Sequence, residues 1–123
     1  TYREMTRALH RTAGLRGATI ETFGHASHFY DTGANLYMIF HAAAGAGRSA
    51  ADLYDELVWQ SLEACHQTGG SITHHHGVGI TKSRLMGREW GTAGVHLWRA
   101  LKSAVDPTSF MNPGDKVVHR ELQ

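Results

Sequence analysis

The sequence has one cysteine, two prolines, a formal net charge of only +1 and no long apolar run. The single cysteine, Cys65, excludes an internal disulfide and fits a reducing compartment. A net charge this close to zero gives no electrostatic reason to expect nucleic acid as a partner. No stretch approaches the roughly 20 apolar residues that a transmembrane helix needs. We therefore expect no nucleic acid, no membrane span, and a cytoplasmic location or a peripheral association with a membrane.

What is present fits a globular domain. The chain has 123 residues, of which 41% are hydrophobic, and this is enough for one domain with its own core. It begins at Thr1 without a methionine, inside what reads as a helix, which indicates a fragment of a longer protein.

Apolar spacing predicts two helices in the first part of the chain. The first runs over residues 2–13, with Thr1 as its cap and Gly14 as its end. The second follows Ser49, which has capping-box spacing to Asp52, and ends at Gly69. One stripe of this helix is apolar and is expected to be buried: Leu53, Leu57, Val58, Leu62 and Cys65.

A hairpin is predicted between these helices. Strands are expected over residues 18–30 and 35–42, joined by Asp31-Thr32-Gly33. In the second strand, Leu36, Met38 and Phe40 point to one face, and the face that holds Tyr37 is also largely apolar. We therefore expect both faces of the hairpin to be covered.

Glycines and prolines divide the last third of the chain. Short helices are predicted over residues 82–90 and 92–105, with Asp106-Pro107 as the stop. The second should carry Val95, Trp98, Leu101 and Val105 on one side. Asn112-Pro113-Gly114 then reads as a turn, and residues 116–118 as a short strand. The fold class is thus α+β: an antiparallel hairpin-centred sheet with packed helices.

The most unusual stretch is Gly69-Gly70-Ser71-Ile72-Thr73-His74-His75-His76-Gly77-Val78-Gly79. Histidine changes charge near neutral pH and serves as an acid, a base or a metal ligand. The flanking glycines would let a flat ligand approach the backbone. If the segment is extended, His74 and His76 face one side and His75 faces the other.

A metal site is one alternative for these histidines. An i, i+2 pair can chelate one ion, and His25, His28 and His41 in the hairpin could supply more ligands. A structural zinc site wants about four ligands, however, and Cys65 lies in a helix stripe. A metal-binding or purely structural module therefore stays open as a different class of function. No Gly-x-Ser-x-Gly elbow supports nucleophilic catalysis.

The histidine stretch resembles the C-terminal catalytic segment of the vanillyl-alcohol-oxidase-type flavoproteins, and within them it is most similar to alkyldihydroxyacetonephosphate synthases. The hairpin Ser27-His28-Phe29-Tyr30-Asp31-Thr32-Gly33-Ala34-Asn35-Leu36-Tyr37 resembles theirs. So do residues 90–101 and the closing Asp106-Pro107 with Asn112-Pro113-Gly114. The resemblance implies that residues 1–123 are the C-terminal segment of an FAD-linked oxidase C-terminal, ferredoxin-like domain. The N-terminal FAD-binding domain would lie outside this chain and would hold most of the FAD.

The resemblance also implies roles for individual residues. Tyr37 matches the family's tyrosine acid/base, and His74, His75 and His76 match its catalytic triple histidine. His76, Gly77, Gly79 and Asn112 would lie beside the flavin.

A comparison with a neighbouring branch favours the synthases over a metal site. Metal-dependent D-2-hydroxyacid dehydrogenases of the same superfamily carry glutamate where this chain has His75, and histidine where it has Tyr37. Both changes remove expected metal ligands, so no metal is expected.

The implied reaction replaces the acyl chain of acyl-dihydroxyacetone phosphate with a fatty alcohol, without net redox change, in ether lipid synthesis. The intact enzyme would be this transferase, and the fragment alone would be inactive and would not retain FAD. It would associate, as a homo-oligomer or through the surface where the missing domain docks. An FAD-linked 2-hydroxyacid oxidase or dehydrogenase is the second enzymatic reading.

Overall fold

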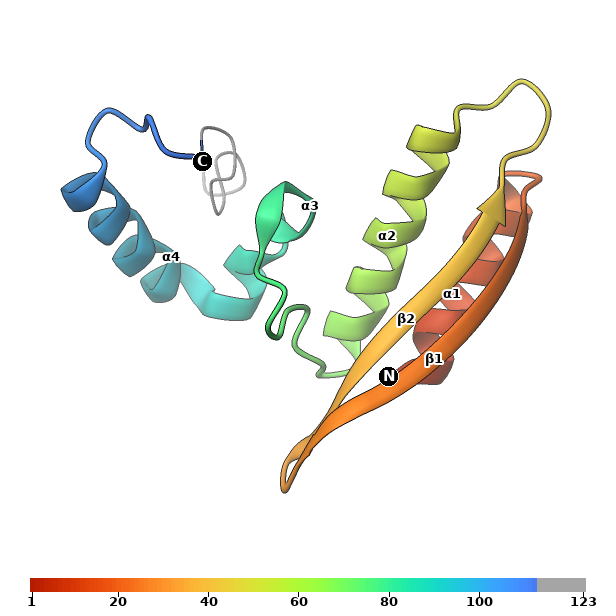
Figure 1. Cartoon of the computed structure of the whole chain (residues 1–123), viewed down its shortest axis with the longest axis horizontal. Coiled ribbons are helices and arrows are strands. Elements are labelled where there is room, and N and C mark those ends of the chain that lie inside the picture. Colours follow the sequence, from red (N-terminus) through yellow and green to blue (C-terminus); the bar gives the residue numbers. More distant parts are fainter. Residues whose placement is uncertain (113–123) are drawn as a thin grey trace. The chain divides into compact units, whose positions relative to one another are not determined.

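The structure is a computed structural model and describes residues 1–112 (Figure 1). The chain divides into two compact units, residues 1–70 and the part that begins at Ser71, and each is described by itself. The first unit holds α1, β1, β2 and α2, and the second holds α3 and α4. Helices and an antiparallel hairpin together confirm the α+β class.

Helix α1, Tyr2–Leu15, is two residues longer than the sequence predicted. Gly14 was expected to end it but lies inside the helix. The chain leaves the helical conformation only after Arg16, because Gly17 adopts a φ of 63°, which glycine tolerates best. Thr1 occupies the N-cap position, but its side chain makes no capping hydrogen bond.

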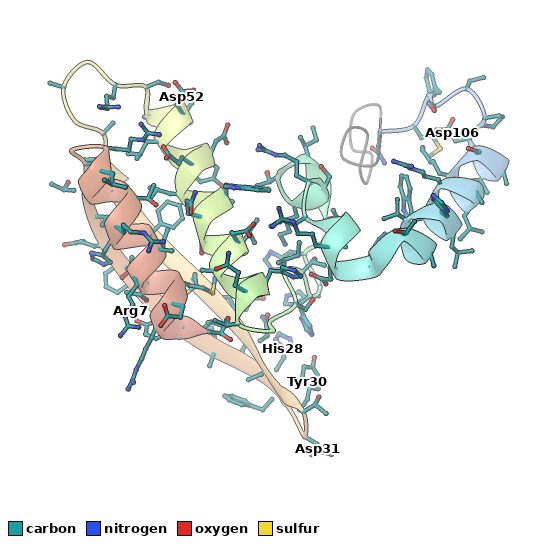
Figure 2. The ribbon with its side chains drawn as sticks, turned by 180° about the vertical axis from the view of Figure 1, so that it is seen from behind. Arg7, His28, Tyr30, Asp31, Asp52 and Asp106 are labelled. Atoms are coloured by element: carbon teal, nitrogen blue, oxygen red, sulfur yellow. The ribbon has the colours of Figure 1, made fainter. Side chains whose placement is uncertain are left out.

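Strands β1 (Thr19–Tyr30) and β2 (Gly33–Ala43) form the predicted antiparallel hairpin, with Asp31 and Thr32 at its turn. Figure 2 shows Tyr30 and Asp31 at the tip. The register pairs Thr19 with Ala43 at the far end.

Helix α2, Ala50–Gln67, begins as predicted, because the Ser49 hydroxyl accepts a hydrogen bond from the Asp52 amide at 3.3 Å. It ends at Thr68, and Gly69 follows with a φ of 75°. The buried stripe of α2 differs from the prediction in the C-terminal half of the helix. Val58 and Leu62 are only partly buried, and the buried residues are Leu53, Leu57, Ser61, Ala64 and Cys65. Small side chains take these places because α1 packs closely there, where Met5 and Ala8 join Ala64 and Cys65 in one cluster.

The core of the first unit lies between the two helices and one face of the hairpin. Leu9 of α1 and Leu57 of α2 are fully buried in the same cluster. Met38 and Phe40 pack against that cluster, and Leu36 packs beside the neighbouring one. The shared face predicted for Leu36, Met38 and Phe40 is therefore confirmed, and it is the face that packs on the core.

The other face of the hairpin is open, which corrects the expectation that both faces are covered. Phe23 and Ile39 pair across the strands and are 50% and 46% exposed. Within residues 1–70 there is no third layer, because α1 and α2 both pack on the opposite face. The outer edges of β1 and β2 also have no partner strand among the described residues.

The second unit contains α3, Gly79–Ser83, and α4, Met86–Val105. The helix predicted over residues 82–90 is thus divided between two elements. The expected break at glycine is present, since Gly91 has non-helical angles (φ 67°, ψ 174°) and kinks α4.

The side of α4 predicted to be apolar is buried only in part. Val95 is fully buried, whereas Leu101 and Val105 are 59% and 80% exposed. The helix ends at Asp106, as predicted. Pro113 and Gly114 of the predicted turn, and the predicted strand over residues 116–118, lie outside the described residues. In the part of the chain that the structure describes, no helix combines the length and hydropathy of a bilayer crossing.

Candidate functional site

The three histidines lie in a loop of bends between α2 and α3, and not in an extended segment. The Nδ1 atoms of His74 and His75 are 2.6 Å apart, and the ring centroids of His75 and His76 are 4.5 Å apart. The expectation that His75 points away from its two neighbours is therefore wrong. Successive bends, in place of a pleated strand, bring neighbouring side chains together.

The contact between His74 and His75 has a chemical consequence. Two Nδ1 atoms at 2.6 Å form a hydrogen bond only if one carries the proton and the other offers a lone pair. Which of the two rings donates depends on their tautomers. All three imidazoles are exposed, so a substrate can reach them. This arrangement can orient a polar ligand and pass a proton.

The loop is closed by a contact between its two ends. The Thr73 hydroxyl donates to the Gly77 carbonyl at 2.8 Å, and the Lys82 ammonium donates to the same carbonyl at 3.1 Å. Desolvation lowers the pKa of Lys82, and the charge of Glu89 partly opposes this shift. Lys82 and Glu89 were not singled out by the sequence, because their contacts depend on how α3 and α4 return to the loop.

Gly77 and Gly79 leave the backbone at the loop exit uncovered. Their φ angles are 76° and 59°, a region that other residues rarely adopt. No atom lies within 4 Å of the position that a Cβ would take at either residue. The backbone beside His76 is therefore open where a Cβ would lie, and the expected place of Gly77 and Gly79 beside a flavin stays a prediction.

Tyr37 lies on the open face of the hairpin, half-buried, and not in a closed core. It pairs with His25 across the strands, and the two ring centroids are 6.0 Å apart. Its phenol is thus on a face that α1 and α2 leave uncovered. The placement of Tyr37 and His74 to His76 on one surface stays a prediction.

The hairpin does not bring His25 and His41 close together. His25 and His41 share the open face, but they are four ladder positions apart, or about 13 Å at the usual rise of a strand. These two side chains therefore do not meet around one ion. His41 instead contacts the edge of Phe23, with ring centroids 5.8 Å apart.

His28 occupies a β-bulge near the hairpin tip (Figure 2). The register passes from Ser27 opposite Asn35 to Phe29 opposite Ala34, so His28 is the extra residue. Its φ of 50° lies in the left-handed region, where histidine occurs more often than most residues. Bulges of this kind re-aim a side chain, and no local pattern around His28 predicts this one.

Asp106 anchors the segment that leads to Asn112. Its carboxylate forms an ion pair with Lys102 and accepts hydrogen bonds from the amides of Phe110 (2.9 Å) and Met111 (3.0 Å). Lys102 also donates to the Met111 carbonyl at 2.8 Å. Asn112 follows with a φ of 47°. The predicted stop at Asp106-Pro107 is therefore also a hydrogen-bonded turn.

The stability of this turn should depend on pH. The hydrogen bond from Lys102 holds the pKa of Asp106 below its usual range. The stabilisation is therefore fully present above the unfolded pKa of about 3.9 and is lost as pH falls through the lower folded value. In thermal unfolding followed across this range, Asp106→Asn should be less stable than wild type near neutral pH and should lack this part of the acid-induced loss. Asp55→Asn, at an exposed position of α2, should follow wild type. Identical pH profiles for wild type and Asp106→Asn would contradict the assignment.

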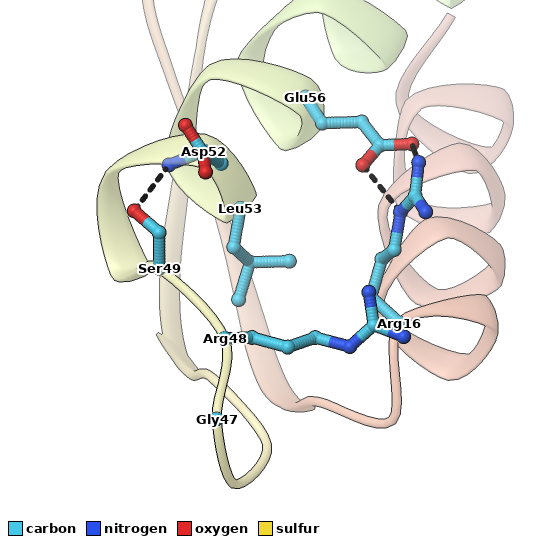
Figure 3. A pocket seen from close by; sticks show the side chains of 7 residues that line it. All are labelled: Arg16, Gly47, Arg48, Ser49, Asp52, Leu53 and Glu56. Atoms are coloured by element: carbon cyan, nitrogen blue, oxygen red, sulfur yellow. Dashed lines mark hydrogen bonds and ion pairs between the residues drawn. The ribbon is translucent and has the colours of Figure 1, made fainter.

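A pocket of about 370 Å³ in the first unit contains none of the predicted site residues (Figure 3). Arg16, at the end of α1, donates to both carboxylate oxygens of Glu56 in α2, at 2.6 and 2.8 Å. This pairing raises the pKa of Arg16 and lowers that of Glu56, to which Arg48 also contributes. Arg48 and Asp52 add one charge of each sign, so the lining has no net charge. The pocket is best explained as part of the packing contact between α1 and α2.

Comparison with known proteins places the whole described chain in one family. The family described as FAD linked oxidases, C-terminal domain, matches residues 1–116. An alkyldihydroxyacetonephosphate synthase of Caenorhabditis elegans is 30% identical over 109 residues, 87% of this chain and 18% of that protein. The corresponding protein of Dictyostelium discoideum is 34% identical over 89 residues, 72% of this chain and 14% of that protein.

A relative of another activity is also similar. The mitochondrial D-lactate dehydrogenase [cytochrome] 1 of Saccharomyces cerevisiae is 41% identical over 69 residues, 56% of this chain and 11% of that protein. The chain thus spans less than a fifth of the length of each of these curated relatives.

Proposed function

Because this chain belongs to the family of FAD linked oxidases, C-terminal domain, we propose that it is the C-terminal segment of an FAD-dependent enzyme of the alkyldihydroxyacetonephosphate synthase type. The observation that carries this proposal is the loop of three exposed imidazoles, with His75 where the metal-dependent hydroxyacid branch has a glutamate. Similarity to two synthases over 72% and 87% of the chain supports it. The substrates would be acyl-dihydroxyacetone phosphate and a fatty alcohol.

The residues of this chain have separate tasks in the proposed reaction. Tyr37 moves a substrate proton at its phenol oxygen, and the His74–His75 pair orients polar groups and passes a proton. FAD would be held mainly by the rest of the protein and would supply the electron-accepting ring. The flavin ring would lie beside four residues of this chain: His76, Gly77, Gly79 and Asn112. The uncovered backbone at the two glycines supports this role. Each of these groups holds or moves a proton, or leaves space for the ring.

The open hairpin face is the proposed contact with the rest of the protein. Phe23 and Ile39 expose apolar surface there, and the strand edges have unpaired backbone groups among the described residues. Surfaces of this kind are covered in stable proteins, because they otherwise associate. When the rest of the protein is absent, we expect this chain to associate with a second copy through the open hairpin face.

A test of the function uses the full-length protein loaded with FAD. Acyl-dihydroxyacetone phosphate and a labelled fatty alcohol should give the labelled ether product, with the flavin oxidised before and after turnover. A 2-hydroxyacid, added without oxygen, should leave the flavin oxidised. The second candidate function, a 2-hydroxyacid dehydrogenase, is favoured by the similarity to the yeast D-lactate dehydrogenase. Lasting bleaching of the flavin by D-lactate, without any ether product, would replace our proposal with this one.

A further inference from the structure

Glu89 in α4 binds the start of the histidine loop with both oxygens of its carboxylate. The Ser71 hydroxyl lies 2.6 Å from Glu89 Oε1, and the Ile72 amide donates to Oε2 at 2.8 Å. Ile72 itself is buried, so the amide that Glu89 satisfies lies in a region of low exposure. Hydrogen bonds to a charged acceptor are stronger than neutral ones, and two of them fix an orientation.

The hydrogen bonds around Ser71 restrict what can replace Glu89. The Ser71 hydroxyl also lies 2.8 Å from the Thr73 carbonyl, but it has only one proton to donate. A carboxylate only accepts, so it competes with the Thr73 carbonyl for that proton. A glutamine could accept from the Ile72 amide through its oxygen and donate to the Ser71 oxygen through its nitrogen. The Ser71 proton would then be available to Thr73, and every contact would be kept.

The start and the end of the loop are therefore held by different elements. Glu89 holds Ser71 and Ile72, which lie immediately before Thr73 and the histidines, from the first turn of α4. Lys82 holds Gly77, immediately after the histidines, from α3. Fixing both ends shortens the free length of the loop, and this limits the positions that its side chains can reach.

We propose that Glu89 is the positioning residue that presents His74, His75 and His76 to the substrate, an inference that rests on the catalytic role proposed for this loop. Glu89 touches none of the three imidazoles in the contacts described and acts through the backbone at Ser71 and Ile72. A misplacement of about 1 Å can lower turnover about 10²-fold, even when it arises far from the chemistry. A contact two residues before His74 can therefore matter for catalysis.

The test separates positioning from general stability with three variants. Glu89→Ala removes both contacts, and Glu89→Gln is the conservative variant that can keep them. Glu4→Ala is the matched control, because Glu4 is also a helix glutamate but pairs with Arg7 on the surface of α1. Backbone order at residues 74–76 is measured by NMR on the 123-residue chain. Turnover and melting temperature are measured on the full-length protein loaded with FAD.

We expect Glu89→Ala to lower the order parameters at residues 74–76 from about 0.85 to below about 0.6, and to lower turnover about 10²-fold. Glu89→Gln should restore both to within a few-fold of wild type, and Glu4→Ala should change neither. An ordered loop in Glu89→Ala, or Glu89→Gln as impaired as Glu89→Ala, would overturn the proposal. So would full turnover of Glu89→Ala in an active parent protein.

Two further measurements keep the test decisive. If Glu89→Ala does not fold, Ser71→Ala removes the hydroxyl contacts to Glu89 and to the Thr73 carbonyl but keeps the contact of the Ile72 amide with Glu89, and the order parameters at residues 74–76 should still fall. Unchanged order in Ser71→Ala would count against the role of Glu89. The NMR result does not depend on enzymatic activity. A wild-type protein that makes no ether product would therefore refute the proposed function, while loss of order in Glu89→Ala would still support the positioning role of Glu89.

Discussion

Replacing Tyr37 by phenylalanine should lower the turnover of the full-length, FAD-loaded protein by about 10²–10⁴-fold, which corresponds to roughly 3 to 5 kcal/mol of barrier. The reason is that the substitution removes one hydroxyl, the group proposed to move a substrate proton. The half-buried position of Tyr37, on the face that α1 and α2 leave open, makes the phenol reachable from outside the first unit. The fold and the bound flavin should be unaffected, because the ring that contacts His25 is retained.

A structural tyrosine would behave differently in the same experiment. Loss of a satisfied hydroxyl should lower stability by about 1 kcal/mol and leave turnover nearly intact. Melting temperature, flavin content and turnover are therefore measured together on each variant. Tyr54→Phe is the matched control, because Tyr54 is exposed on α2 beside Phe40 and should keep full turnover. If Tyr37→Phe is destabilised yet fully active, the phenol is structural and the catalytic assignment is wrong.

Leu57→Ala should lower the free energy of unfolding of the first unit by about 2–5 kcal/mol. Leu57 is fully buried where α1, α2 and the core face of the hairpin meet, and Leu9 and Leu53 belong to the same cluster. Deleting its isobutyl group removes buried apolar area and leaves a cavity that these neighbours fill only in part. A loss of this size is a large fraction of the 5–15 kcal/mol that stabilises a typical domain.

The control for this substitution lies in the same unit. Leu15→Ala removes the same group from a side chain at the end of α1 that is 77% exposed, so we expect a change of at most about 0.5 kcal/mol. The free energies of unfolding of Leu57→Ala and Leu15→Ala are measured by denaturant unfolding followed by far-ultraviolet circular dichroism. Equal effects of Leu57→Ala and Leu15→Ala would show that α1 and α2 do not share the core described above.

Several predictions that depended on near neighbours in the sequence agree with the structure, although Thr1 makes no capping hydrogen bond. Ser49 caps α2 through Asp52, three residues away, and this contact needs no other part of the chain. Alternation along β2 was enough to identify the face of Leu36, Met38 and Phe40, because side chains in a strand point to opposite faces in turn. The stretch of three histidines between glycines was itself sufficient to mark the candidate site and its resemblance to a family.

Predictions that depended on more distant residues failed or were missing. Gly14 was predicted to end α1, but the helix continues to Leu15, and its buried Ala13 packs in one cluster with Leu53 and Leu57 of α2. The stripe of α2 shifted from Val58 and Leu62 toward Ala64, because its position depends on the approach of α1.

The sequence by itself determined the α+β class, which side chains of β2 share a face, the capped start of α2 and the membership in a flavoprotein family. These predictions rest on local spacing and on motifs, and neither depends on how distant parts of the chain pack. Only the tertiary structure decided that the loop bends so that the rings of His74 and His75 meet, and that Glu89 holds the start of this loop. Glu89 reaches Ile72 across 17 residues, a contact that no local pattern encodes. It exists because α3 and α4 return the chain to the loop, where a partly buried amide needs an acceptor.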